Sequence, residues 1–165
     1  MKAPICGICL NSNILCMACK KRLDSGEITE GEVRISRLIS ELAKGFGPLN
    51  EITVKKVIEG DNVSVVICNR GDGAKLIGKE GSVIKKLSRL AQKTIRVVEE
   101  TDDMREFVQN LIYPVPVIGL NILYKPEREV MKIIIPKGRS LPLPEKAFAE
   151  IISAMFNKAS MITHE

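Results

Sequence analysis

Two glycines, Gly78 and Gly81, separate two helical patterns near the middle of this 165-residue chain. Residues 72–77 are expected to form a short helix. After the glycines, apolar residues recur at helical spacing: Val83, Ile84, Leu87, Leu90 and Ala91. Because glycine lacks a Cβ, it lets the backbone turn sharply and approach another chain closely. The pattern therefore predicts two helices joined by the loop Gly78-Lys79-Glu80-Gly81.

The segments around this loop predict three strands and a further helix. Runs rich in β-branched residues at 52–58 and 63–68 flank the turn sequence Glu59-Gly60-Asp61-Asn62, which favours an antiparallel hairpin. Residues 94–98 predict a third strand. Thr29 and Glu32 form a capping-box pattern before an apolar stripe, so a helix is expected ahead of the hairpin. The predicted order is helix, strand, strand, helix, GxxG loop, helix, strand.

Residues 101–165 predict a weaker copy of this unit. A helix is expected from Asp102 or Asp103 to about residue 111, followed by a hairpin of strands 117–124 and 128–135. Pro144 is expected to start a helix that ends at about residue 156. Residues 160–163 are expected to form a last strand. This order indicates an internal repeat. The copy has Lys137-Gly138-Arg139-Ser140 where its own GxxG loop would lie.

Positive charge is concentrated around the glycine loop. The whole chain has a net charge of +5, whereas residues 70–96 alone contain eight basic and two acidic residues, a local net charge of +6. A compact basic segment favours a polyanion as partner, most often a nucleic acid. The alternative is an ordinary solvated helix face.

The loop itself suits the backbone of a nucleic acid. Its free N–H groups and the positive end of the second helix would face a phosphate, and neighbouring lysines add charge. Ile77, Val83 and Ile84 would line an apolar groove for unstacked bases. The candidate RNA-binding residues are Lys75, Ile77, Gly78, Lys79, Glu80, Gly81, Ser82, Val83, Lys85 and Lys86. A helical corner without any ligand is the competing interpretation.

Catalytic and nucleotide-hydrolysing functions fit the sequence poorly. Residues 73–79 match the first seven positions of a P-loop, but Glu80 stands where a Ser or Thr should bind magnesium. The only histidine, His164, is next to the C-terminal residue, where fraying is expected. An acidic cluster, Glu99, Glu100, Asp102, Asp103 and Glu106, lies at a helix start and is expected to cap it. We therefore expect no enzyme activity and no small-molecule substrate.

With these motifs, residues 30–100 resemble a type II KH domain. The helix before the hairpin distinguishes type II from type I, and residues 30–165 as a whole resemble the tandem KH region of archaeal NusA-like transcription termination and antitermination factors. The resemblance implies binding of single-stranded RNA through Gly78, Lys79, Glu80 and Gly81, beside RNA polymerase. Residues 101–165 would be a second, degenerate KH-like domain that supports the fold or docks a partner without gripping RNA.

Residues 1–23 contain two CxxC pairs, Cys6 and Cys9, then Cys16 and Cys19. Four thiolates suit a tetrahedral Zn²⁺, and four protein ligands leave no open position, so the metal would be structural. Such a finger would replace the hydrophobic core that so short a segment lacks. An iron-sulfur cluster or other iron site, and redox thiols, remain alternatives. Cys68 alternates with Val66 in a strand and is expected to be a core residue.

Together these observations predict an α+β fold. It would comprise a four-cysteine zinc finger at residues 1–23, a type II KH domain at 30–100 and a degenerate KH-like domain at 101–165. A second functional hypothesis is an adaptor that docks on RNA polymerase or the ribosome with incidental RNA contact. The N-terminus lacks an apolar signal region and the longest apolar stretch, residues 111–124, is too short to span a bilayer. A cytoplasmic location without membrane contact is expected.

Overall fold

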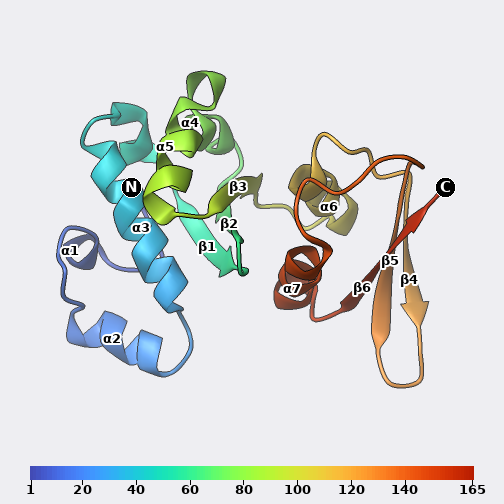
Figure 1. Cartoon of the computed structure of the whole chain (residues 1–165). Coiled ribbons are helices and arrows are strands. Elements are labelled where there is room, and N and C mark those ends of the chain that lie inside the picture. The colour runs from blue at the N-terminus through green and yellow to red at the C-terminus, as the bar shows by residue number, and fades with distance from the viewer. The chain divides into compact units, whose positions relative to one another are not determined.

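The computed structural model describes all 165 residues and has a mixed α+β fold, which confirms the predicted class (Figure 1). The chain forms two compact units, and each is described by itself. The first unit comprises residues 1–59 and 64–100, and the second comprises residues 60–63 and 101–165. Each unit contains one three-stranded sheet.

The first unit contains the predicted helices and strands, preceded by two short helices. Its elements in chain order are α1 (Gly7–Leu10), α2 (Met17–Asp24), α3 (Glu30–Ala43), the 3-10 helix η1 (Gly47–Glu51), β1 (Val54–Glu59), β2 (Val63–Cys68), α4 (Gly73–Ile77), the 3-10 turn η2 (Lys79–Gly81), α5 (Ser82–Ala91) and β3 (Thr94–Glu99). The strand order is β1-β2-β3. Helix α3 packs on β1, and α4 and α5 pack on β3.

The start of α3 has the predicted capping box. The Thr29 hydroxyl accepts the Glu32 N–H at 3.2 Å, and the Glu32 carboxylate accepts the Thr29 N–H at 2.8 Å. These bonds satisfy N–H groups that have no partner within the helix. The same carboxylate accepts the Val57 N–H at 3.3 Å. Glu32 therefore also joins α3 to β1.

The centre of the first sheet is fully apolar apart from one serine. All six residues of β2 are buried, as expected for a strand between two neighbours, and Val66 lies opposite Val57 in the antiparallel pair with β1. Cys68 is completely buried in this strand, which confirms its predicted place in the core. Burial, followed by the negative charges of Glu99 and Asp72, raises the pKa of the Cys68 thiol to about 12.

The N-terminal segment is built into the first unit. Lys2 forms an isolated parallel bridge with Thr53, next to β1. A separate apolar cluster joins the cysteine segment to α3, and its buried members are Ile5, Cys9, Leu10, Cys19, Ile28 and Val33. Residues 1–23 thus share a small core with α3.

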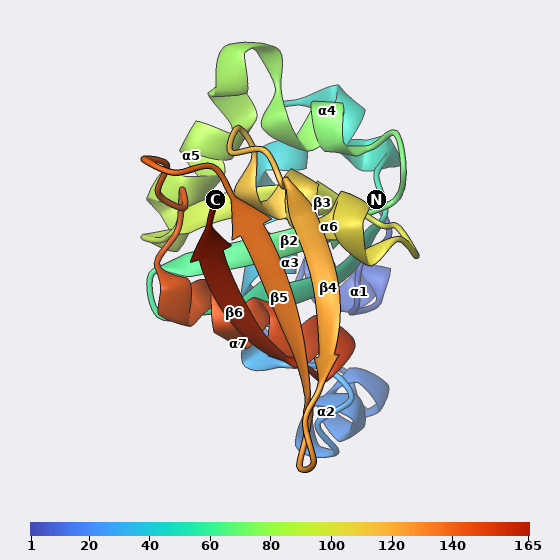
Figure 2. The same cartoon turned by 90° about the vertical axis from the view of Figure 1, so that its right-hand side faces the viewer.

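The second unit repeats the sheet arrangement with fewer helices. Its elements are α6 (Met104–Ile112), β4 (Gly119–Tyr124), β5 (Glu129–Ile135), α7 (Glu145–Phe156) and β6 (Ala159–His164). Figure 2 shows the three strands side by side, with β5 in the middle. Strand β5 pairs antiparallel with β4 and parallel with β6. No helix lies between β5 and α7, where the first unit has α4 and the glycine loop.

The expectation that the C-terminus frays was wrong. His164 is the last residue of β6 and lies opposite Ile135 of β5. The Lys137 N–H donates to the Glu165 carbonyl oxygen, and the Glu165 N–H donates to the Ile135 carbonyl oxygen, both at 3.1 Å. Parallel pairing with β5 therefore holds the end of the chain.

The predicted capping by the acidic cluster is confirmed at Asp103. Its carboxylate accepts the N–H groups of Arg105 at 2.8 Å and Glu106 at 3.1 Å, at the start of α6. The Glu99 carboxylate accepts the Gly73 N–H at 3.0 Å, at the start of α4. Among the helices of both units, none combines the length and apolar character needed to cross a membrane.

Candidate metal centre and nucleic-acid interface

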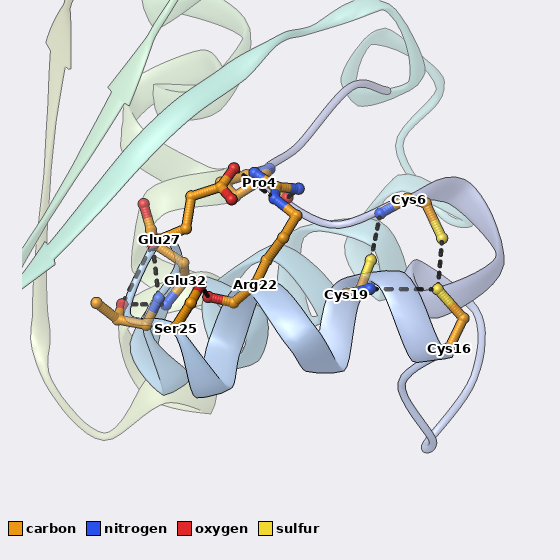
Figure 3. Close-up of polar contacts among 9 residues, drawn as sticks. Pro4, Cys6, Cys16, Cys19, Arg22, Ser25, Glu27 and Glu32 are labelled. Carbon is orange, nitrogen blue, oxygen red and sulfur yellow. Dashed lines mark hydrogen bonds and ion pairs between the residues drawn. The ribbon is translucent and has the colours of Figure 1, made fainter.

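The four cysteines of the N-terminal segment converge on one point. The sulfur atoms of Cys6, Cys9, Cys16 and Cys19 all lie within 4.8 Å of one another. The Cys6 sulfur is 3.4 Å from that of Cys9 and 3.9 Å from that of Cys16. Figure 3 shows the side chains of Cys6, Cys16 and Cys19 turned toward one another.

Each CxxC pair is shaped by the start of a helix. Cys6 and Cys16 are the residues immediately before α1 and α2, so Cys9 and Cys19 lie one turn further on the same side of each helix. The pairs also bond to each other: the Cys16 N–H donates to the Cys9 sulfur at 3.1 Å, and the Cys6 N–H donates to the Cys19 sulfur at 3.4 Å. These crossed bonds hold the four sulfurs together.

The protonation of the thiols differs within the cluster. A bond from the Cys9 backbone, followed by bonds with the other thiols, lowers the pKa of Cys6 to about 7. The bond from the Cys16 backbone acts to lower the pKa of Cys9, but burial and the neighbouring sulfurs outweigh it and raise that pKa to about 12. The pKa of Cys16 is lowered chiefly by the backbone N–H of Cys19. Four thiolates this close repel one another, and a bound cation is the ordinary means of keeping all four deprotonated.

The donor set fits a tetrahedral metal ion. Zn–S bonds of about 2.3 Å in a tetrahedron place neighbouring sulfurs about 3.8 Å apart. The separations of 3.4 and 3.9 Å around Cys6 lie close to that value. The four cysteines can therefore hold one metal ion, and their side chains fill all of its positions.

Two arginines fix the backbone around the cysteines. The Arg37 Nε atom, from α3, donates to the Cys9 carbonyl oxygen at 3.0 Å. Arg22 donates from Nη1 to the Pro4 carbonyl oxygen at 2.7 Å, and its Nε atom pairs with the Glu27 carboxylate at 2.6 Å (Figure 3). Lys21 and Lys20 of α2 are exposed.

The glycine loop forms a sharp turn between α4 and α5. Gly78 has φ 73° and ψ 172°, and Gly81 has φ 73° and ψ 19°, both outside the range that other residues readily adopt. A Cβ on Gly78 would lie 2.5 Å from the Val83 Cγ2 atom, whereas one on Gly81 would meet nothing closer than 3.6 Å. Glu80 between them is also left-handed, with φ 53°. The loop therefore brings an open stretch of backbone to the start of α5.

The exposed positive charge lies in the loop and on α5. The side chains of four basic residues are exposed there: Lys79, Lys85, Lys86 and Arg89. The Lys85 Nζ atom also donates to the Glu80 carbonyl oxygen at 3.1 Å. Lys75 is less available, because its Nζ atom lies 3.5 Å from the carboxylates of Glu51 and Asp72. Likewise, Lys93 pairs with Glu59 at 3.5 Å.

The three apolar residues that were predicted to line a groove for bases differ in their exposure. Ile77 is 42% exposed beside the loop, and Ile84 is half-buried. Val83 is only 5% exposed and belongs to the core beneath α5. Ser82 is exposed at the first position of α5.

A cavity that the sequence did not predict lies next to the loop. It has a volume of about 200 Å³, and its lining residues are Glu41, Leu42, Gly45, Phe46, Ser82, Val83 and Lys86. The last three belong to the predicted RNA-binding set, whereas the first four come from the end of α3 and the turn after it. An aromatic residue between Gly45 and Gly47 was the available signal.

Comparison with known proteins shows a similarity in fold. No protein-family model matches the chain, and no curated protein matches it. A solved structure described as the crystal structure of APE1850 is similar, with a TM-score of 0.60 and 20% sequence identity. The match covers 78% of this chain and 96% of that one. At this identity the likeness concerns the fold alone.

Proposed function

We propose that this chain binds single-stranded RNA through the glycine loop, as a type II KH domain does. The observation that carries the proposal is the loop geometry: two glycines with positive φ expose backbone at the start of α5, where no side chain caps the helix. The order α3, β1, β2, α4, loop, α5, β3 supports the same assignment. The N–H groups of Gly81 and Ser82 donate to the carbonyl oxygens of Gly78 and Lys79 within the turn, so they are not free, contrary to the expectation from the sequence. A phosphate would instead bind at the positive end of α5, beside the exposed lysines.

The surroundings of the loop favour this function over a plain helical corner. A turn between two helices that binds no ligand requires glycines, but it does not require exposed lysines. Lys79, Lys85 and Lys86 are exposed on or within five residues of the loop, and the exposed side of Ile77 offers an apolar contact for a base. A KH module clamps about four nucleotides with this combination. A role beside RNA polymerase, in transcription termination or antitermination, is the cellular setting that the NusA-like resemblance suggests.

Salt-dependent RNA binding tests the loop. Wild-type protein is expected to bind short single-stranded RNAs with a slope of log K against log salt of roughly −2, if about three phosphates are neutralised. The variant Lys79→Asp/Glu80→Asp keeps both glycines and sets two carboxylates against the phosphates, so it should lose most of this affinity. Fluorescence anisotropy measures both. Equal binding by a folded double variant would contradict the proposal and leave the loop a structural corner.

For the four-cysteine site we propose structural Zn²⁺. The sulfur separations suit Zn–S bonds, and four protein ligands give a closed site of the structural kind. The ion would hold together a segment whose only other core is the small apolar cluster shared with α3. Elemental analysis and colour test the metal: an iron-rich, coloured protein would contradict zinc.

A second candidate function, docking of the cysteine segment onto a larger complex, is favoured by its exposed apolar side chains. Ile8, Ile14 and Met17 are 76%, 78% and 90% exposed. Large apolar side chains gathered on a small exposed segment are typical of an interaction site. RNA polymerase and the ribosome are the partners we propose for it.

Point substitutions test docking better than deletion, because deletion of residues 1–23 would also remove core residues such as Ile5. The variant Ile8→Ser/Ile14→Ser/Met17→Ser keeps every cysteine and should retain metal. Under the docking hypothesis it no longer co-purifies with RNA polymerase or ribosomes, while its affinity for free RNA stays within about 2-fold of wild type. Unchanged co-purification of this variant would count against docking.

A further inference from the structure

The cavity between α3 and α5 has the composition of a base-binding pocket. Its lining includes the half-buried ring of Phe46, which follows the end of α3, and the apolar side chains of Leu42 and Val83. Glu41 and Lys86 supply one carboxylate and one ammonium group to the lining. An aromatic ring with a few polar groups around it is the usual way in which proteins bind an unstacked base.

The position of the cavity relates it to the glycine loop. Ser82 and Val83, two of its lining residues, directly follow Gly81. A phosphate held at the loop would therefore lie beside the cavity, and the base of the same or an adjacent nucleotide could reach it. The side chain of Lys86 lies one helical turn after Ser82, on the same side of α5.

The two charged side chains would discriminate among the four bases. A carboxylate is acceptor-only and binds best to two neighbouring N–H donors. Guanine presents such a pair, N1–H and the N2 amino group, next to the acceptor O6, which an ammonium group can contact. Adenine and cytosine offer a single amino donor beside an acceptor nitrogen, which a carboxylate repels, and uracil offers one N–H. Glu41 and Lys86 together complement guanine.

We infer that this cavity binds a guanine base of the RNA held at the glycine loop. In this arrangement Phe46 contacts the base plane, Glu41 accepts its N1–H and N2 amino hydrogens, and Lys86 donates to O6. Glu41 is exposed and pairs with Lys44 in the free protein. The base would therefore replace an exposed ion pair that contributes little to stability. The inference rests on the proposed RNA-binding function and adds a base preference to it.

The test compares matched oligouridine RNAs that carry one internal guanine, adenine or inosine. Wild-type protein should bind the guanine RNA about 10-fold more tightly than the adenine RNA, the discrimination typical of one two-bonded contact. Inosine lacks the N2 amino group and should lie between them. Glu41→Gln should reduce the preference to less than about 2-fold, because guanine RNA loses the carboxylate contact and adenine RNA no longer meets a repelling carboxylate. Glu30→Gln removes the same charge at the far end of α3 and should keep the wild-type preference.

A second arm uses free guanosine monophosphate as competitor, because a mononucleotide carries the same base. It should bind at least about 10-fold more weakly than the guanine RNA, since it lacks the further phosphates held by the loop. Equal affinity for the mononucleotide would overturn the assignment to RNA. Binding of all three RNAs without a guanine preference, or a preference that survives Glu41→Gln, would overturn the inference alone. Absence of any RNA binding would overturn the proposed function with it.

Discussion

The double variant Cys9→Ala/Cys19→Ala should contain no bound metal and unfold at a clearly lower temperature than wild type. Cys9 and Cys19 are the buried pair of the four-cysteine cluster, and both also belong to the apolar cluster shared with Val33 of α3. Structural zinc contributes folding free energy directly. We expect a loss of more than about 3 kcal/mol for the first unit, or more than about 12 °C in its unfolding midpoint.

Elemental analysis and thermal unfolding followed by circular dichroism measure the two effects. Wild type should contain one metal ion per chain, and stripping it with a strong chelator should lower the unfolding midpoint by most of the same amount. The remainder reflects the two buried sulfurs that the double variant also removes from the apolar cluster. Cys68→Ala is the matched control, because it removes a buried sulfur far along the sequence from the cluster and should leave the metal content unchanged. If metal-free and metal-loaded wild type unfold at the same temperature, the site does not stabilise the fold.

Local sequence signals were sufficient for most elements of the fold. Strand β2 starts and ends where the β-branched run does, and α3 starts at the Thr29 capping box. The spacing of the CxxC pairs likewise predicted that the four cysteines meet, and the sulfur positions confirm it. In each case the residues that determine the structure lie close together in the sequence, at most 13 positions apart for Cys6 and Cys19. The pattern along the sequence therefore reflects the physical contact directly.

The features that were missed depend on partners far apart in the sequence. Lys75 and Lys93 counted as available positive charge, but Glu51 and Glu59 lie beside them in the fold. His164 is ordered because β6 pairs with residues about 30 positions earlier in the chain, which no local signal encodes. The cavity at Phe46 forms only where the end of α3 meets the start of α5. Charge counts along a sequence therefore overestimate the free positive surface.

The two glycines of the loop should respond very differently to substitution by alanine. Gly78→Ala is expected to destabilise the first unit by about 3–5 kcal/mol, from backbone strain and overpacking together. At φ 73° and ψ 172° an alanine is strained, and its Cβ would lie 2.5 Å from the Val83 Cγ2 atom and 2.9 Å from the Val83 nitrogen. Gly81→Ala meets no close atom and should cost about 1–2 kcal/mol, the penalty for a left-handed residue.

Urea unfolding of the two variants measures this difference, with the same slope m expected for both if only the native state is affected. Similar losses would show that Val83 moves aside and that the loop is less constrained than its geometry indicates. The comparison also decides which variant can report on RNA. Because Gly81→Ala should stay folded, a loss of RNA affinity in it would reflect the Cβ between the backbone and the phosphate. A loss in Gly78→Ala would not separate that contact from misfolding of the loop.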